Sequence, residues 1–344
     1  EKEELERYQS IVNDVQIGIL YKLITELQDN AFYDSQKKYF ILIDDLDKNW
    51  MPHDSFYDLL VKTLLETVRE INHKFDNVKI IIAMRNDIYF RIFHKIKKGE
   101  PQREKWVDNL IELKWNQDYL KDFLDKRLKK ILHYSAEKKE PSVDNILPNT
   151  RTLQRKGKKE VAYEYIIERT LLRPRDLVDF FNVTIEQSNQ VLNLTWRNIE
   201  KAELEYSKSR LASIYEEWNN IFFGLNYFFP LLQKLGPIFS IEDIKEEDIL
   251  EVLTHDIINE CKWLKKLAEY YDKKDMNVNK IRDEIINTLY VVGLIGIKKK
   301  NEKTKYSCEH KFELKPIKYH DIEYFTIHVH KMLWKALKLK EKYV

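Results

Sequence analysis

Glycine is scarce in this chain, with only 7 among 344 residues. Together with apolar residues that recur at three- and four-residue steps, this scarcity predicts a helix-rich protein. Only two cysteines occur, Cys261 and Cys308. They lie far apart and without metal-ligand spacing, which excludes a disulfide framework and indicates a reducing compartment or chance.

Long apolar runs and a strong charge of one sign are also absent. No run approaches the length that crosses a bilayer, and no signal-peptide pattern occurs, so we expect a cytoplasmic protein with no membrane partner. The formal net charge is only +2, so overall charge does not favour nucleic acid as a partner. The length allows two or three domains with hydrophobic cores.

One apolar run, Tyr39–Ile43, organises the chain, and two carboxylates, Asp44 and Asp45, follow it directly. Such a run predicts a strand buried on both faces, as in a parallel sheet. Open α/β sheets bind ligands at the carboxyl edge, where these carboxylates would lie. Asp44 would then hold Mg²⁺ and Asp45 would polarise the attacking water. The alternative is a buried strand followed by an acidic turn.

Helical and strand patterns surround this run. An amphipathic stripe over Val12–Leu27 precedes it, and a second helix with an apolar face from Phe56 to Ile71 follows it. A second apolar run, Val78–Met84, ends in Arg85, and a third, shorter strand is predicted over Asn109–Trp115. Strand, helix and strand in this order predict a parallel unit with a right-handed crossover.

The remainder of the chain is mostly helical in pattern. A helix follows the cap Asn116, a lysine-rich loop covers Glu137–Glu160, and helical pattern resumes until Pro174 interrupts it. Near the end, helices precede a hairpin with the turn Lys298–Lys305 and a last helix over Lys331–Leu339. This order is typical of a winged-helix outline.

Several motifs resemble one family. Ile43-Asp44-Asp45-Leu46-Asp47-Lys48 resembles the extended Walker B motif of bacterial P-loop ATPases of the KAP and STAND type, within the AAA+-like group. Ala83-Met84-Arg85-Asn86-Asp87 is similar to their sensor 1 strand, and Glu112-Leu113-Lys114-Trp115-Asn116 to the strand that precedes their lid. Thr170-Leu171-Leu172-Arg173-Pro174-Arg175-Asp176 resembles the Pro-Arg motif at which the lid faces the nucleotide. The terminal Ile327-His328 fits the winged-helix end of such chains.

The resemblance covers nearly the whole chain and implies an architecture. It implies a fold of α/β plus all-α class: a partial parallel P-loop NTPase core over 1–135, a linker and helical lid domain over 136–235, and a C-terminal winged helix over 236–344.

The resemblance also implies site residues, with ATP and Mg²⁺ as cofactors. The implied roles are Asp44 at the metal, Asp45 and Arg85 in catalysis, and Arg173 and Arg175 at the nucleotide. Arg173 and Arg175 flank a proline suited to the first position of a helix, whose N-terminus favours anions. The alternative for these two arginines is an exposed basic turn.

The glycine-rich loop that cradles phosphates in this family, Gly-x-x-x-x-Gly-Lys-[Ser/Thr], is absent. The nearest fragments, Gly157-Lys158-Lys159 and Lys303-Thr304, lack the glycine spacing. In the family this loop precedes Walker B, so we expect the chain to be the C-terminal part of a longer protein, and the first residue, Glu1, in place of an initiator Met agrees. A degenerate pseudo-ATPase is the alternative.

Other candidates also have structural alternatives. Arg85 can pair with Asp87 or Asp45 in place of sensing a phosphate. Asp47 can brace the loop after Walker B or be a solvated turn residue.

Two features near the C-terminus, a pair of histidines and a lysine-rich turn, have possible functional interpretations that we do not favour. His328 and His330 would share one face of a strand, as two zinc ligands would, but no third ligand lies nearby, so we expect structural histidines. The turn Lys298–Lys305 could contact nucleic-acid phosphate. With Glu302 diluting its charge, a solvated hairpin tip is the favoured interpretation.

The sequence thus predicts the sensor, lid and winged-helix part of an ATP-dependent switch ATPase of bacterial signalling or antiviral defence. It would hydrolyse ATP with Mg²⁺ only when the upstream P-loop is present, so this chain alone would be inactive. Expected partners are a nucleotide and either a second copy or a protein effector, with nucleic acid not favoured. The alternative is a non-enzymatic winged-helix module that binds DNA or a protein partner and keeps a relict NTPase core.

Overall fold

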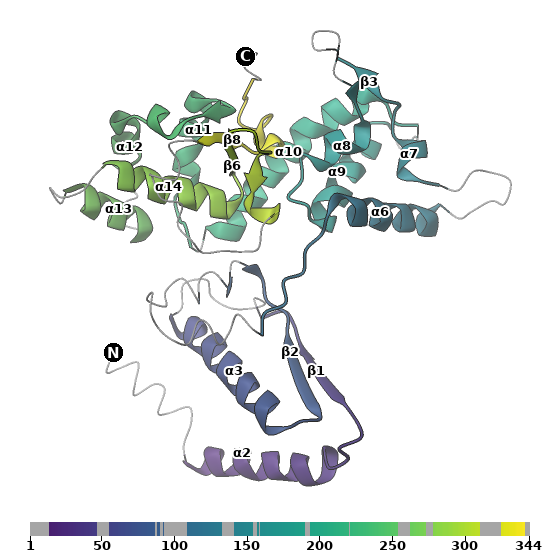
Figure 1. Cartoon of the computed structure of the whole chain (residues 1–344), viewed down its shortest axis with the longest axis vertical. Helices are drawn as coiled ribbons and strands as arrows, with labels where there is room; N and C mark the ends of the chain where they lie inside the picture. The colour runs from purple at the N-terminus through teal and green to yellow at the C-terminus, as the bar shows by residue number, and fades with distance from the viewer. Residues whose placement is uncertain are drawn as a thin grey trace. The chain divides into compact units, whose positions relative to one another are not determined.

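The computed structural model divides the chain into two compact units, Glu1–Glu100 and Pro101–Val344, and each is described by itself (Figure 1). Both mix helices with small sheets. No helix among the described residues is long and apolar enough to span a membrane. The residues described are 14–46, 55–86, 88–89, 92, 109–132, 141–153, 157, 159–189, 193–219, 221–253, 262–272, 278–309 and 325–340.

The first unit is a strand–helix–strand unit preceded by a helix. Its elements are α2 (Asp14–Glu26), the π-helical η1 (Leu27–Ala31), β1 (Tyr39–Ile43), α3 (Ser55–Lys74) and β2 (Val78–Ile82). β1 and β2 are parallel neighbours, with Tyr39 opposite Val78 and Ile43 opposite Ile82. The two predicted strands and the helix between them are confirmed, and Figure 1 shows α3 running beside the strand pair.

Only one face of this small sheet is covered. Val78 and Ile80 are 1% and 9% exposed, and they form a core cluster with Val68 of α3. On the opposite face Phe40 and Leu42 are 66% and 74% exposed. The prediction that the apolar run of β1 is buried on both faces is therefore wrong for this structure, because the helix packs against one side alone.

The second unit begins with a helical part. After the segment 109–116, its elements are α6 (Gln117–Ile131), α7 (Val143–Ile146), β3 (Arg151–Thr152), β4 (Lys159–Glu160), α8 (Ala162–Ile167), α9 (Pro174–Glu186) and α10 (Trp196–Trp218). α6 begins where predicted, because the Asn116 side chain accepts a hydrogen bond from the Tyr119 N–H at 2.7 Å. α9 begins at Pro174, the predicted interruption.

The third predicted strand does not form. Residues 109–116 have no regular strand structure, and within them Ile111 and Leu113 are 85% and 90% exposed. A strand needs a neighbour that pairs with its backbone, and none of the sheets of the structure includes this segment.

The C-terminal part of the second unit combines helices with a four-stranded antiparallel sheet of order β5-β8-β6-β7. Its helical elements are η2 (Leu225–Phe228), α11 (Phe229–Leu235), η3 (Ile241–Asp243), α12 (Glu246–Leu253), α13 (Lys262–Asp272), α14 (Val278–Val292), η5 (Ser307–Glu309) and η6 (Lys331–Leu333). Its strands are β5 (Ile238–Phe239), β6 (Ile295–Lys299), β7 (Lys305–Tyr306) and β8 (Phe325–Val329). The predicted domain boundaries after residues 135 and 235 stay predictions.

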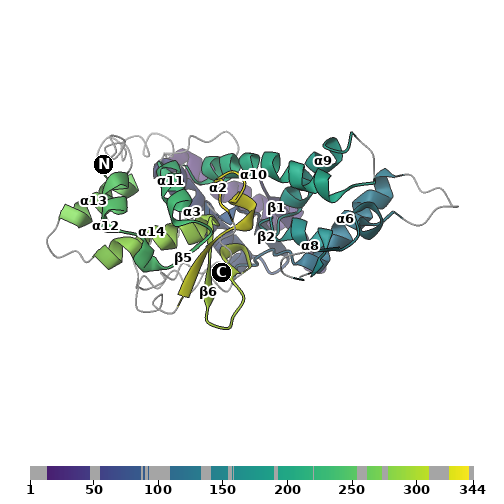
Figure 2. The same ribbon diagram turned by 90° about the horizontal axis from the view of Figure 1, so that it is seen from above.

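The last predicted helix is much shorter than expected. Of the predicted helix, only η6 is helical, and residues 334–338 are turns. The backbone N–H of Ala336 donates to the Ser207 hydroxyl of α10 at 2.9 Å, and Lys338 has a left-handed φ of 53°. Ala336 is thus held against α10 by a tertiary contact, which takes a donor that a continuing helix would need. Figures 1 and 2 both show α10 between the C-terminal sheet and helices α8 and α9.

Candidate functional site

Three of the predicted site residues lie at one end of the β1–β2 sheet. Asp44 and Asp45 follow β1 directly, and Arg85 follows β2 after two residues. The ladder continues past β2, since the Ala83 N–H donates to the Ile43 carbonyl at 2.8 Å. All three charged side chains are exposed. Because the strands are parallel, the structure brings two carboxylates and a guanidinium to the same carboxyl edge.

The backbone turns sharply between the two carboxylates. Asp45 has a φ of 58°, in the left-handed region, and its N–H donates to Oδ1 of Asp44 at 2.7 Å. Aspartate tolerates this region better than most residues, because its short side chain can bond locally. After the turn, the buried Tyr57 of α3 donates through its hydroxyl to the Leu46 carbonyl at 3.1 Å. The turn is thus attached to α3, and Asp47 lies outside the described residues.

The carboxylate of Asp44 fits the ligand preference of a hard cation. Among the described residues its one hydrogen bond is to the Asp45 N–H, so the other oxygen can coordinate. Within the same residues no three His, Cys, Asp or Glu side chains gather as a metal site. A Mg²⁺ ion at Asp44 would therefore take most of its ligands from phosphate oxygens and water, which is how this ion is usually held.

The other two predicted residues belong to the second unit, at the start of α9. Arg173 donates from both terminal nitrogens to Glu217 of α10, at 2.8 and 3.2 Å. Burial lowers the pKa of the Arg173 guanidinium, but nearby negative groups, Glu217 first among them, together raise it above its ordinary value. Arg173 is thus engaged in a bidentate pair within the protein.

Arg175 differs from Arg173 in its surroundings. It lies in the first turn of α9 after Pro174, and its side chain is exposed. It forms no ion pair or hydrogen bond through its side chain with the described residues. Of the two predicted arginines, Arg175 is the one whose guanidinium can reach a ligand without breaking a bond.

A buried ion pair between α9 and α10, next to this turn, was not predicted from the sequence. Asp176, 1% exposed, lies with Oδ1 3.2 Å from Nη2 of Arg210 and accepts the Leu171 N–H at 3.1 Å. Burial raises the pKa of Asp176, although Arg210 acts against it. The hydroxyl of Tyr206 and Nε of Arg210 are buried and have no hydrogen-bond partner within the described part of the chain. The pair holds the Arg-Pro-Arg turn onto α10.

A second buried pair joins α10 to the region of α8. Nε of Arg169 donates to Glu203 at 2.7 Å, and the Tyr165 hydroxyl donates to the same carboxylate at 2.6 Å. The Arg169 guanidinium also lies 3.3 Å from the centroid of the Tyr165 ring. The sequence carried a signal for these contacts, because Glu203, Arg210 and Glu217 recur every seven residues and therefore share one face of a helix.

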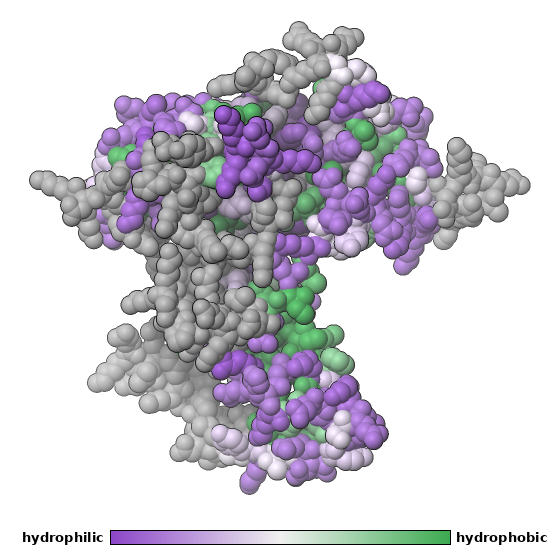
Figure 3. Space-filling view, in the orientation of Figure 1, coloured by the Kyte–Doolittle hydropathy of each residue, from purple (hydrophilic) through white to green (hydrophobic). Residues whose placement is uncertain are grey.

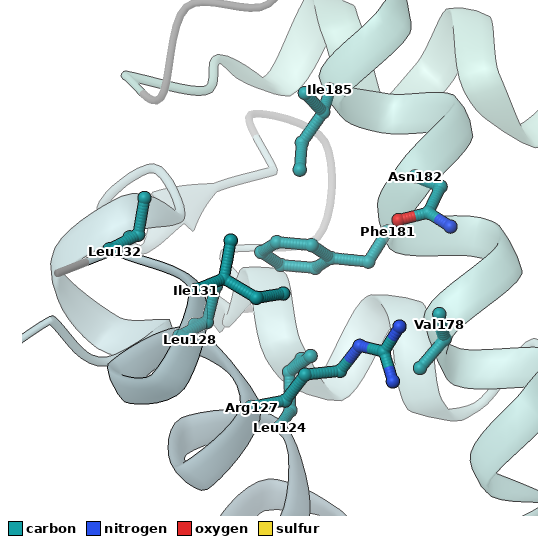
Figure 4. Close-up of a pocket in the computed structure, with 9 residues that line it drawn as sticks. All are labelled: Leu124, Arg127, Leu128, Ile131, Leu132, Val178, Phe181, Asn182 and Ile185. Carbon is teal, nitrogen blue, oxygen red and sulfur yellow. The ribbon is translucent and has the colours of Figure 1, made fainter.

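A small apolar groove lies between α6 and α9, apart from the predicted site residues (Figure 4). Its volume is about 80 Å³, and Figure 4 shows the ring of Phe181 pointing toward Ile131 across it. Arg127 and Asn182 are its polar lining residues. The remaining lining is apolar, so the groove has no constellation for acid–base or metal chemistry. The full lining is Leu124, Arg127, Leu128, Ile131, Leu132, Val178, Phe181, Asn182 and Ile185.

The two histidines near the chain end have separate surroundings. His330 is 2% exposed, and its Nδ1 accepts the Met332 N–H at 3.2 Å. Its ring centroid lies 4.3 Å from that of Tyr306. His328, on β8, lies 3.0 Å through Nε2 from the Thr326 hydroxyl. Burial lowers the pKa of His330 to about 3 and that of His328 to about 4. Both are therefore neutral at physiological pH, and their structural role stays a prediction.

Comparison with known proteins gives two similarities. Residues 118–215 match the FunZ-associated C-terminal helical domain, a stretch that runs from α6 into α10. The chain is 26% identical over 303 residues to a transposon gamma-delta 80.3 kDa protein of Escherichia coli (strain K12). That match covers 83% of this chain and 39% of the relative, so the chain spans well under half of the relative's length. No solved structure matches the chain.

Proposed function

We propose that this chain is the sensor, lid and winged-helix-like part of an ATP-dependent switch ATPase. One observation carries the proposal: a parallel strand pair ends in Asp44 and Asp45 on one strand and in Arg85 on the other, at one edge. Carboxylates beside a guanidinium at the carboxyl edge of a parallel sheet suit a metal-bound triphosphate.

The roles follow from the positions of these side chains. Asp44 would bind Mg²⁺ through its second carboxylate oxygen, and the ion, when bound, neutralises phosphate charge. Asp45, whose backbone lies in the left-handed region, would orient the attacking water. Arg85 would contact the terminal phosphate with its planar fork of donors. Arg175 would report the nucleotide state to the helical part of the second unit.

The phosphate-binding loop would come from a segment outside this stretch. The sequence contains no glycine-rich loop that could cradle phosphates, and the E. coli relative is much longer than the chain. We therefore expect the 344-residue chain to bind ATP weakly and not to hydrolyse it, and the longer polypeptide to do both. Conformational switching or assembly would be the output, and the trigger stays open.

The test is Asp45→Asn in the longer polypeptide. Loss of a water-orienting carboxylate is expected to lower magnesium-dependent hydrolysis by about 10²–10⁴ while ATP affinity stays the same. Asp76→Asn, an exposed carboxylate just before β2 at the opposite end of the sheet, is the matched control and should hydrolyse at the wild-type rate. Hydrolysis by Asp45→Asn at the wild-type rate would refute the Walker B assignment.

The second candidate function is a non-enzymatic module whose C-terminal sheet and helices bind DNA. One finding favours it, the transposon name of the E. coli relative. The lysine-rich turn would be the contact. Lys305 is already 2.6 Å from Glu302, and Nζ of Lys299 lies 5.2 Å from the Phe325 ring centroid. Two of its lysines thus have partners within the protein, which weighs against this candidate.

A further inference from the structure

The β1–β2 sheet is open on the side of β1. On the uncovered face, Phe40 and Leu42 of β1 are more exposed, at 66% and 74%, than Ile81 of β2 at 49%. On the covered face, Ile41 of β1 is 40% exposed, whereas its partner Ile80 is 9% exposed. Exposure therefore rises toward β1 on both faces, as at the side of a sheet where a neighbour is missing. Figure 3 shows hydrophobic side chains gathered along this part of the first unit.

The outer edge of β1 also has backbone groups that the sheet does not use. The Tyr39 N–H donates to Asn77 at 2.8 Å, so Tyr39, Ile41 and Ile43 present their backbone groups to β2. Alternate residues of a strand present these groups to opposite edges. The N–H and C=O groups of Phe40 and Leu42 thus point away from β2, and no third strand lies there among the residues that the structure describes.

The outer edge of β2 is different, because a side chain occupies it. Oδ1 of Asn72, in α3, accepts the Ile80 N–H at 2.7 Å, and its Nδ2 donates to the Ile80 carbonyl at 3.1 Å. This carboxamide makes the two bonds that a peptide group of a neighbouring strand would make. The outward backbone groups in the middle of β2 are therefore satisfied within the unit, whereas those in the middle of β1 have no partner among the described residues.

We infer that the outer edge of β1, with the apolar face of Phe40 and Leu42, binds a further strand and a covering helix of the same polypeptide, from a segment outside this stretch. The inference rests on the proposed function, since it names the surface on which the missing part of the core assembles. Parallel sheets occur with both faces covered, and an exposed apolar edge invites aggregation. The E. coli relative is much longer than the part that matches, so its remaining residues are numerous enough to include such a segment.

The experiment measures thiol labelling at position 42. Leu42→Cys is made in a background with Cys261→Ser and Cys308→Ser, in both the 344-residue chain and the longer polypeptide encoded by the same gene. We expect rapid labelling in the chain and labelling slower by about 100-fold or more in the longer polypeptide, because a buried thiol reacts only through local opening. Glu70→Cys, on an exposed position of α3, should label at equal rates in both. Phe40→Cys serves as a second probe if Leu42→Cys does not fold.

Three outcomes would overturn the inference. The first is rapid labelling in the longer polypeptide, or a gene that encodes no further residues. The second is slow labelling in the 344-residue chain with a doubled molecular mass, which assigns the surface to a second copy. The third is slow labelling in a monomeric chain, which assigns it to a segment of the chain itself. Protection at position 42 together with wild-type hydrolysis by Asp45→Asn would keep the inference and refute the ATPase proposal.

Discussion

At the scale of single residues, two arginines flanking one proline have different surroundings. Arg173 precedes Pro174, where the backbone is held extended, and its guanidinium turns back to Glu217. Arg175 follows Pro174 inside the first helical turn and is exposed. The same motif therefore supplies one arginine that holds two helices together and one that is available for a ligand.

Alanine substitutions of the two arginines should lower the free energy of unfolding of the 344-residue chain by different amounts. Arg173→Ala removes a bidentate but partly solvated pair and should lower the free energy of unfolding of the second unit by about 1 kcal/mol. Arg175→Ala should change it by less than about 0.5 kcal/mol, because the side chain is exposed. Chemical denaturation followed by tryptophan fluorescence measures both. A larger loss for Arg175→Ala than for Arg173→Ala would contradict this assignment.

The buried His330 should make the stability of the second unit depend on pH. Burial lowers its pKa to about 3 from the ordinary 6.5, so between these values the unfolded chain binds a proton that the folded chain does not. Stability is complete above about pH 6.5 and should fall as the pH drops toward 3, by at most about 1.4 kcal/mol per pH unit from this group. His328 acts in the same direction down to about pH 4.

Denaturation midpoints between pH 4 and 7 measure this dependence. His330→Gln should flatten the curve even if it lowers its maximum, whereas His73→Gln, at an exposed position of α3, should leave the curve unchanged. A curve of equal slope in wild type and His330→Gln would show that another group is responsible.

At the scale of elements, α10 organises the second unit through charged side chains on one face. Glu203, Arg210 and Glu217 lie seven residues apart and bind Arg169, Asp176 and Arg173, the last two at the start of α9. Buried ion pairs add little net stability compared with apolar packing, but they fix which partner a helix meets. We therefore interpret the row of Glu203, Arg210 and Glu217 as fixing the register between α10 and the helices before it.

Breaking the most buried of these pairs should be costly. Arg210→Met leaves the carboxylate of Asp176 buried without its cation and should lower the free energy of unfolding by about 3–5 kcal/mol. The double variant Asp176→Asn/Arg210→Met removes both charges and should recover a substantial part of the loss. Arg197→Met, at an exposed position of the same helix, is the control and should be nearly neutral. A double variant no more stable than Arg210→Met would argue against the pair as the cause.

At the scale of the whole molecule, the net charge indicates which kind of partner the chain can bind. The net charge of +2 is small for 344 residues, and the lysine-rich turn near the C-terminus includes Glu302. We therefore expect the C-terminal part to contact protein, either within the same polypeptide or in an effector.

Duplex DNA binding by the 344-residue chain distinguishes the two candidate functions. We expect no dissociation constant below about 1 µM at physiological salt, because few phosphates would be neutralised. Tighter binding that weakens by about one logarithmic unit per contact as salt rises tenfold, and that is lost in the triple variant Lys298→Gln/Lys299→Gln/Lys300→Gln, would favour the DNA-binding module. Lys126→Gln/Lys129→Gln/Lys130→Gln on α6 is the matched control for charge.

Features that depend on neighbouring residues could be predicted from the sequence alone. The apolar runs that become β1 and β2, the cap at Asn116 and the helix start at Pro174 could all be predicted, because strand propensity, capping and the fixed φ of proline act within a few residues. The placement of Asp44, Asp45 and Arg85 at one edge followed from the same local patterns once both strands were assumed to be parallel.

Features that depend on residues far apart in the sequence could be established only from the folded structure. Asp176 meets Arg210 across 34 positions of sequence, and Ala336 meets Ser207 across 129. Apolar character predicted burial for β1, but burial requires a neighbour, and the residues around Phe40 have none on one side. The same reason holds for 109–115, whose apolar side chains predicted a strand that finds no pairing partner among the described residues. Local chemistry sets which elements can form, and the presence or absence of a partner sets which of them are completed.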